Sequence, residues 1–76
     1  MKDGILKMKV EIIILDLLGH SLNHATSSGA SKKKYDKKDF YTSALSYIEQ
    51  HMTKNGMELV NVHGSGQVYA YHLIKR

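Results

Sequence analysis

The sequence predicts a small α+β domain of the order strand–helix–strand–strand, with a three-stranded sheet and one helix packed on a face. The first observation is an apolar stripe at helical spacing within residues 36–56. The second is a pair of alternating segments, residues 57–63 and 67–75, joined by a Gly-Ser-Gly loop typical of a β-hairpin. The third is a β-branched segment, residues 8–18, ahead of the helix. Together they predict a β-α-β-β domain.

Composition limits the class of protein. Seventy-six residues make a single domain over residues 1–76, of which residues 1–7 read as a loose leader. The chain has no cysteine, which excludes disulfides and thiolate zinc sites. It shows no secretion signal, and its longest apolar run, residues 12–15, is far shorter than the roughly 20 residues of a membrane span. We therefore expect a cytoplasmic protein.

The first strand, residues 8–18, is apolar on both faces. Val10, Ile12 and Ile14 share one face, and Ile13, Leu15 and Leu17 share the other. Strands of this kind are covered on both faces, whereas one helix covers only one face of a small sheet. We therefore expect a homodimer, formed through the second face or through an edge. The alternative is that the following loop folds back over that face.

Residues 19–35 are rich in Ser, Gly, Ala and Lys and lack periodicity, so they predict a long flexible basic loop. This composition favours either disorder or ordering on binding. Five lysines lie at the end of this loop and just beyond it: Lys32, Lys33, Lys34, Lys37 and Lys38. They account for much of the excess of 11 Lys and Arg over 7 Asp and Glu, which gives a net charge of +4.

The helix is predicted to begin at Asp36, whose side chain suits the N-cap, with Asp39 near the positive end of the helix dipole. Its apolar stripe is Tyr41, Ala44, Leu45, Ile48 and Met52, widened by Phe40 and Tyr47. Gly56 can adopt the left-handed conformation that ends a helix. The stripe is expected to dock the helix on the sheet.

The hairpin strands alternate in character. In residues 57–63, Val60 and Val62 are predicted to share one face, and Met57, Leu59 and Asn61 the other. In residues 67–75, Val68, Ala70, His72 and Ile74 alternate with Tyr69, Tyr71 and Leu73. The small side chains suit a closely packed helix. The tyrosine face is then left to contact solvent or a partner, since tyrosines combine an apolar ring with a polar end.

The step Gly56-Met57-Glu58-Leu59-Val60 resembles a family of small bacterial and phage domains of unknown function. Those domains have a strand, a helix, a Gly-Trp-Glu-Leu-Val-type step into a hairpin, and a last strand ending in Lys-Arg. The matching parts are residues 47–55, 56–62 and 69–76, with Met57 in place of the tryptophan. The resemblance implies the β-α-β-β fold and no known activity. The element order is also similar to that of dodecin-type flavin carriers, but their aromatic platform has no counterpart because the chain lacks tryptophan.

The histidines are the candidate metal ligands. His20 and His24 are four apart, which on a helix would place both imidazoles on one face. A third ligand would have to come from His51, His63 or His72, and the sequence does not choose among them. We interpret the pair as surface histidines in a polar loop and predict no metal site. His72 would need a carboxylate such as Asp16 or Glu58 to act as a general base.

Recognised catalytic motifs are absent from the sequence, since neither H-E-x-x-H nor G-x-S-x-G occurs. We therefore expect no enzymatic activity, no catalytic residues and no cofactor. The prediction is a small non-catalytic protein-binding module, such as an inhibitor or adaptor encoded by a phage or bacterium that acts on a host protein. The predicted contact residues are Lys32, Lys33, Lys34, Tyr35, Lys37, Lys38, Tyr69 and Tyr71. The alternative is a nucleic-acid-binding accessory protein that uses the segment 32–38, where lysines would meet phosphates and Tyr35 would stack on a base.

Overall fold

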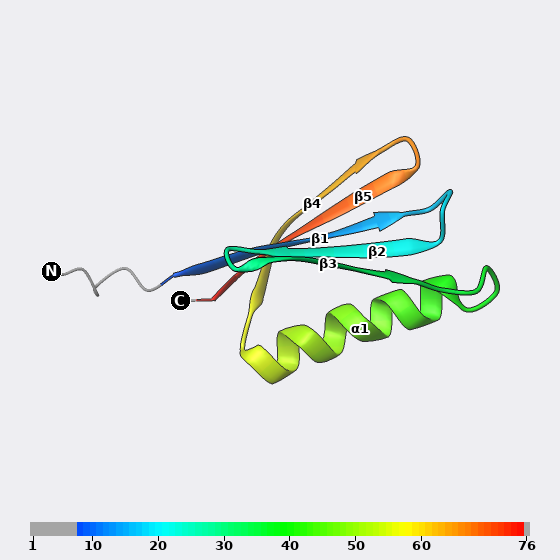
Figure 1. Cartoon of the computed structure of the whole chain (residues 1–76). Helices are drawn as coiled ribbons and strands as arrows, with labels where there is room; N and C mark the ends of the chain where they lie inside the picture. Colours follow the sequence, from blue (N-terminus) through cyan, green and yellow to red (C-terminus); the bar gives the residue numbers. More distant parts are fainter. Residues whose placement is uncertain (1–7, 76) are drawn as a thin grey trace, which may run out of the picture.

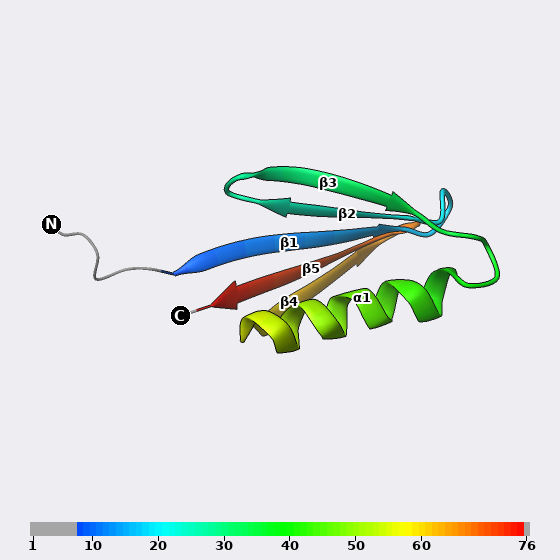
Figure 2. The ribbon, with the colours of Figure 1, turned by 60° about the horizontal axis from the view of Figure 1, so that its bottom comes forward.

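The computed structural model describes residues 8–75, and the predicted leader at residues 1–7 lies outside that range. The elements follow one another along the chain as shown in Figure 1. They are β1 (Lys9–Asp16), β2 (Ser21–Thr26), β3 (Gly29–Lys34), α1 (Phe40–Asn55), β4 (Glu58–Ser65) and β5 (Val68–Lys75). The helix α1 lies along one side of the sheet, and both views agree on this arrangement (Figures 1 and 2).

The five strands form one sheet in the order β3-β2-β1-β5-β4, and every neighbouring pair is antiparallel. The predicted α+β class is right, but the prediction of a three-stranded sheet is wrong. The error lies in β2 and β3, which add a second hairpin between the first strand and the helix. No helix within residues 8–75 is long and apolar enough to cross a membrane.

The predicted flexible loop at residues 19–35 is instead the β2–β3 hairpin. In β2, Leu22 and His24 are buried against the core. This segment therefore has a buried face, although most of its residues are polar. The Thr26 hydroxyl donates to the carbonyl of Gly29 and accepts from the Ser28 amide, and so ties the turn together. Every residue of β3 is exposed, so its pairing with β2 rather than burial holds it in the sheet.

The turn from β1 into β2 is built on Asp16. Its Oδ1 accepts hydrogen bonds from the amides of Leu18 and Gly19, both at 3.1 Å. His20 then adopts φ of 55°, a left-handed conformation that non-glycine residues adopt only in such constrained turns. This turn reverses the chain early enough for β2 to pair directly with β1.

The helix begins later than predicted. Asp36 lies before α1, where its carbonyl accepts from the Asp39 amide, and Asp39 occupies the N-cap position without a side-chain capping bond. The predicted Asp36 cap is therefore wrong. The predicted end of the helix is confirmed. Gly56 has φ of 63°, and its N–H donates to the carbonyl of Met52 in the last turn.

The buried face of α1 is displaced around the helix relative to the predicted stripe. Phe40, Ala44 and Ile48 are buried, whereas Tyr41 and Leu45 are exposed. Residues at i, i+4 and i+8 lie close together on a helix surface, so Phe40 and not Tyr41 marks the line of contact with the sheet. The eight core residues are Ile13, Leu15, Leu22, Phe40, Ala44, Ile48, Met57 and Leu73.

The helix covers the opposite face of β5 from the one predicted. Leu73 is fully buried beneath α1, and Tyr71 packs against the same core. The face predicted for the helix, which carries Val68 and Ala70, is instead the uncovered one, because these residues alternate along β5 with the core-packed Tyr71 and Leu73. The large side chains of Tyr71 and Leu73 fill the space beneath α1, because the helix buries only three of its own residues there.

A β-bulge in β4 alters the predicted alternation of faces. Leu59 pairs with Leu73, but the next pair is Asn61 with His72, so Val60 is an extra residue. Val62 then pairs with Tyr71, which places Val62 on the same face as Leu59. The prediction that Val60 and Val62 share a face opposite Leu59 is therefore wrong.

The position of the core gives a matched pair of substitutions. We expect Phe40→Ala to lower the free energy of unfolding by about 3–5 kcal/mol, because it leaves a large cavity under α1. The neighbouring Tyr41→Ala should cost less than about 1 kcal/mol, since that ring is 62% exposed. Urea unfolding followed by circular dichroism measures both. Where Phe40→Ala does not fold, Phe40→Leu replaces it, and equal losses at the two positions would contradict the observed helix orientation.

Candidate functional site

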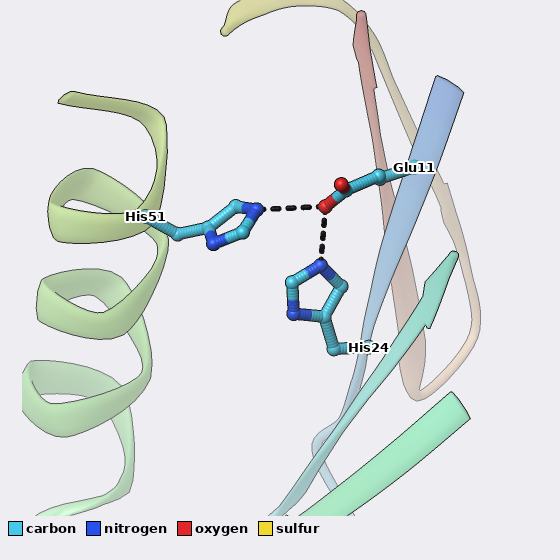
Figure 3. Close-up of side chains that lie close together, drawn as sticks. All are labelled: Glu11, His24 and His51. Carbon is cyan, nitrogen blue, oxygen red and sulfur yellow. Dashed lines mark hydrogen bonds and ion pairs between the residues drawn. The ribbon is translucent and has the colours of Figure 1, made fainter. Parts of the chain in front are cut away.

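Three ionisable side chains from distant parts of the chain meet between the sheet and the helix. Oε1 of Glu11 lies 2.6 Å from Nε2 of His24 and 2.7 Å from Nε2 of His51 (Figure 3). The two imidazoles thus share a single carboxylate oxygen. The three ligand-type atoms all lie within 4.8 Å of one another. We call this group of Glu11, His24 and His51 the Glu-His-His cluster.

The sheet register positions two of the three side chains. His24 on β2 pairs with Ile13 on β1, and Glu11 lies two residues before Ile13 on the same face. Glu11 and His24 are therefore diagonal neighbours, a separation that side chains of this length can span. His51 comes from the C-terminal half of α1 and points across from the helix toward Glu11 (Figure 3). The cluster thus connects β1, β2 and α1.

The remaining nitrogen of each imidazole is also held. Nδ1 of His24 lies 2.7 Å from the Tyr47 hydroxyl, and Nδ1 of His51 lies 3.2 Å from Nδ2 of Asn55. A proton on Nε2 lets each imidazole donate to Glu11, and the Tyr47 hydroxyl and the Asn55 amide can then donate to the two Nδ1 atoms. Both rings are therefore fixed in orientation at both nitrogens.

The cluster is largely shielded from water. The side chain of His24 is 8% exposed, that of Glu11 12% and that of His51 20%. Burial by itself would raise the pKa of the Glu11 carboxyl, but the hydrogen bonds and charges of His24 and His51 outweigh it, so the pKa lies below its usual value. Burial raises the pKa of Tyr47, and the nearby Tyr35 and Glu11 raise it further.

Aromatic contacts pack around the cluster. The rings of His24 and His51 meet edge-to-face with centroids 4.4 Å apart, and Tyr47 stands edge-on to His24. The ammonium of Lys33 lies 5.5 Å from the centre of the Tyr47 ring, in a cation–π contact. Tyr47 therefore contacts both His24 and Lys33 on the side of α1 that faces the sheet.

Solvent approaches the cluster from the β2–β3 turn. A shallow hollow of about 340 Å³ reaches His24, and it is lined by His24, Thr26, Ser28, Gly29, Ala30 and Ser31. A smaller one of about 100 Å³ reaches Glu11 past Thr26 and Ser28. Both lie next to the cluster, so small solutes and ions have a short path to it.

The five lysines predicted to form one basic contact segment are divided by the strand. Within β3, Lys32 and Lys34 pair with Asn23 and Ser21, whereas Lys33 pairs with Leu22 and points to the helix side. Lys37 and Lys38 are exposed in the connection from β3 to α1. The structure therefore distributes these lysines over two faces of the sheet and a turn.

The three predicted contact tyrosines have different surroundings. Tyr35 packs against the core, and burial raises its pKa. Tyr71 also packs against the core from β5. Tyr69 is 40% exposed on the helix side of the sheet, which leaves it the most accessible of the three.

The candidate histidine pair is separated in the structure. His20 lies in the β1–β2 turn with its ring 5.7 Å from that of Phe40, whereas His24 joins His51, which was one of three open choices for a third ligand. Glu11 was missed, although it occupies a strand position in line with the buried Ile13 and Leu15. Two features of the sequence could have indicated the cluster. Glu11 is a carboxylate on the core face of a strand, and Tyr47 and His51 lie one helical turn apart on the helix.

Comparison of the chain with protein-family models, with curated proteins and with solved structures found no match in any of the three.

The lowered pKa of Glu11 predicts a pH dependence. A carboxyl whose pKa falls below 4.5 on folding stabilises the protein above that pH, and this contribution is lost as the pH falls through the folded value. We therefore expect the free energy of unfolding to decrease more between about pH 6 and pH 3 in the wild type than in Glu11→Gln. Urea unfolding at a series of pH values measures the difference.

Glu49→Gln, which removes an exposed carboxylate elsewhere on α1, controls for the loss of one negative charge and should follow the wild type. Parallel curves for the wild type and Glu11→Gln would show that Glu11 is not stabilised as a carboxylate in the folded protein.

Proposed function

We propose that this chain is a small non-catalytic protein-binding module that binds through the uncovered face of its sheet, and that a second copy of the chain is the partner on that face. The observation that carries the proposal is an apolar stripe on the central strand, β1, and on its neighbour β5. It consists of Val10, Ile12, Ile14, Val68, Ala70 and Ile74, with His72 between the last two on the same face. Val10 is 53% exposed and Val68 is 41% exposed.

The same face becomes polar toward both edges of the sheet. Asn23 and Lys32 pair with each other on the β2–β3 side, and Asn61 and His63 lie on the β4 side. An apolar centre with a polar rim is the general anatomy of a protein interface. In a two-fold dimer, both chains contribute the same surface to the interface. An apolar stripe near the middle of the sheet can pack on the same stripe of a second chain in this way.

Both sheet edges are unsuited to strand addition, which favours the face over an edge. The outer strand β3 carries Lys32, Lys33 and Lys34, all exposed, and lysines on an edge strand oppose pairing with another chain. The other outer strand, β4, is interrupted by the bulge at Val60. Of the two dimer arrangements considered from the sequence, face-to-face packing is therefore the one we propose.

The alternative cover for this face is also disfavoured. Residues 21–34 extend the sheet at the β1 edge as β2 and β3 and do not fold back over the stripe. Within residues 8–75, α1 lies on the opposite face (Figure 2). Apolar residues on both sides of β1 then favour a second molecule as the cover.

The size of the face is sufficient for a dimer. Five strands about 4.8 Å apart, each about seven residues long at about 3.3 Å per residue, span a flat area on the order of 550 Å². Side chains give such a face a larger accessible area, and stable interfaces bury about 600–1,000 Å² on each partner. Two such sheets packed face to face about 10 Å apart would form a β-sandwich with a helix on each outer side.

The dimer is tested by placing a charge in the stripe. The wild type should sediment at twice the chain mass, and Ile12→Lys should sediment as a folded monomer, since Ile12 lies at the centre of the uncovered face between Ala25 and His72. Thr53→Lys adds the same charge on the exposed side of α1 and should remain dimeric. Analytical ultracentrifugation measures all three. A wild type that stays monomeric at high micromolar concentration would contradict the second copy as partner.

We further propose that the dimer acts by occupying the surface of another protein, as inhibitors and adaptors do. In a face-to-face dimer the helix side of each sheet stays outward, and Tyr69 remains accessible there. Lys37 and Lys38 lie at the end of the sheet where β3 leads into α1, and the β4–β5 turn before Tyr69 lies at that same end (Figure 1). These residues supply an aromatic ring and positive charge for a partner.

Nucleic-acid binding by residues 32–38 is the alternative, and one pull-down separates the two. We expect one stoichiometric protein that survives nuclease and is lost when Tyr69→Ala is combined with Lys37→Glu and Lys38→Glu. Mass spectrometry identifies the bound material, and Lys54→Glu on α1 serves as the charge control. A broad set of proteins that disappears with nuclease, together with an affinity that falls steeply with salt, would support nucleic acid instead.

A further inference from the structure

We propose that Glu11, His24 and His51 form a binding site for a divalent transition-metal ion of the Zn²⁺ type. The three side chains supply two imidazole nitrogens and one carboxylate oxygen, a ligand set found in zinc sites that leave a fourth position open. Their ligand atoms converge within 4.8 Å and come from β1, β2 and α1. The site lies on the helix side of the sheet and does not depend on the proposed dimer face.

The two contacts between Glu11 and the imidazoles need only small changes to accept the ion. Zinc bonds to nitrogen and oxygen are about 2.0–2.2 Å long, which places tetrahedral ligand atoms about 3.3 Å apart. The two contacts from Glu11 Oε1 to the Nε2 atoms are 2.6 and 2.7 Å, so each must lengthen by about 0.6 Å. Small side-chain rotations of Glu11 and His51 can provide this, because His51 is the most exposed member of the cluster.

The partners of the outer nitrogens suit the metal-bound state. An imidazole that binds a metal through Nε2 carries its proton on Nδ1, which then needs an acceptor. The Tyr47 hydroxyl, 2.7 Å from Nδ1 of His24, can donate or accept, so it serves both states without moving. Asn55 Nδ2 also donates to the carbonyl of His51 at 2.9 Å, so its amide must give up that hydrogen bond to present its oxygen to Nδ1 of His51.

The electrostatic surroundings also favour a cation. Glu11 is 12% exposed, and its carboxylate oxygen lies between the two imidazole nitrogens at the centre of the cluster. A dication at the centre of the cluster would lie against this partly buried negative charge, where the low dielectric strengthens their attraction. The hollow beside the β2–β3 turn provides the route of entry to His24.

A metal at this place would fasten the helix to the sheet. A chain of 76 residues has a small core, and small domains commonly gain stability from a structural metal. Here the ion would link the C-terminal half of α1 to β1 and β2, beside the core residue Ile48. Metal binding would therefore raise the melting temperature, since it stabilises the folded state alone.

The test is a zinc titration of the full chain without an affinity tag. Isothermal titration calorimetry should give one Zn²⁺ per chain with micromolar or tighter affinity, and thermal unfolding should shift to higher temperature with Zn²⁺. His51→Gln and Glu11→Gln should each weaken binding at least about 100-fold, because each removes a direct ligand. Tyr47→Phe should weaken it about 10-fold, the usual effect of losing a group that orients a ligand.

His63→Gln is the matched control, since it removes an exposed histidine on β4 outside the cluster and should leave the affinity unchanged. NMR of the imidazole nitrogens adds a direct readout: Zn²⁺ should shift the Nε2 signals of His24 and His51 and not that of His63. Binding that is absent, or that survives both His51→Gln and Glu11→Gln in folded variants, would overturn the proposal. In that case the cluster would be a hydrogen-bonded network only.

Discussion

The fold is governed by an imbalance between its two layers: one helix is available for a sheet of five strands. A 16-residue helix can cover a single face of the sheet, and it does so along the line Phe40, Ala44 and Ile48. The other face is left with an apolar stripe on β1 and β5. The buried core, the uncovered face and the position of the Glu-His-His cluster all follow from this single packing.

The covered side combines two kinds of interaction. Near the start of the helix the contact is apolar, with Phe40 fully buried among core residues. Farther along α1 it becomes polar, where His51 meets Glu11 and His24. A partly buried carboxylate is costly unless it is hydrogen-bonded or paired, and two imidazoles provide that compensation. The same compensation creates a set of atoms that matches the ligands of a divalent metal.

The two sides of the sheet therefore support separate proposals. The uncovered face is the dimer interface that we propose, whereas the cluster is the proposed metal site between the sheet and the helix. Each can fail without the other, because the residues of the stripe point away from the helix and those of the cluster point toward it. A dimer held together by its sheets would keep both copies of the Glu-His-His cluster on its outer sides.

Much of the fold could be read from local signals. The β-branched run of β1, the apolar spacing of α1, the glycine at its end and the alternation of β5 all depend on neighbours a few residues away, so the sequence determined them. The hairpin β2–β3 could not be read, because Leu22 is the single large apolar residue in a polar segment and β3 buries no residue. These residues form strands through the pairing of β2 with β1 and of β3 with β2, which no local pattern in the segment indicates. The sequence shows His24 and His51 as histidines, but it does not show that they contact Glu11. That contact depends on the register of β1 with β2 and on the rotation of α1 about its axis.

The sequence alone determined the α+β class and the apolar character of both faces of β1. The tertiary structure decided the number of strands, the face that the helix covers and the residues of the cluster. Each of these depends on contacts between segments far apart in the chain.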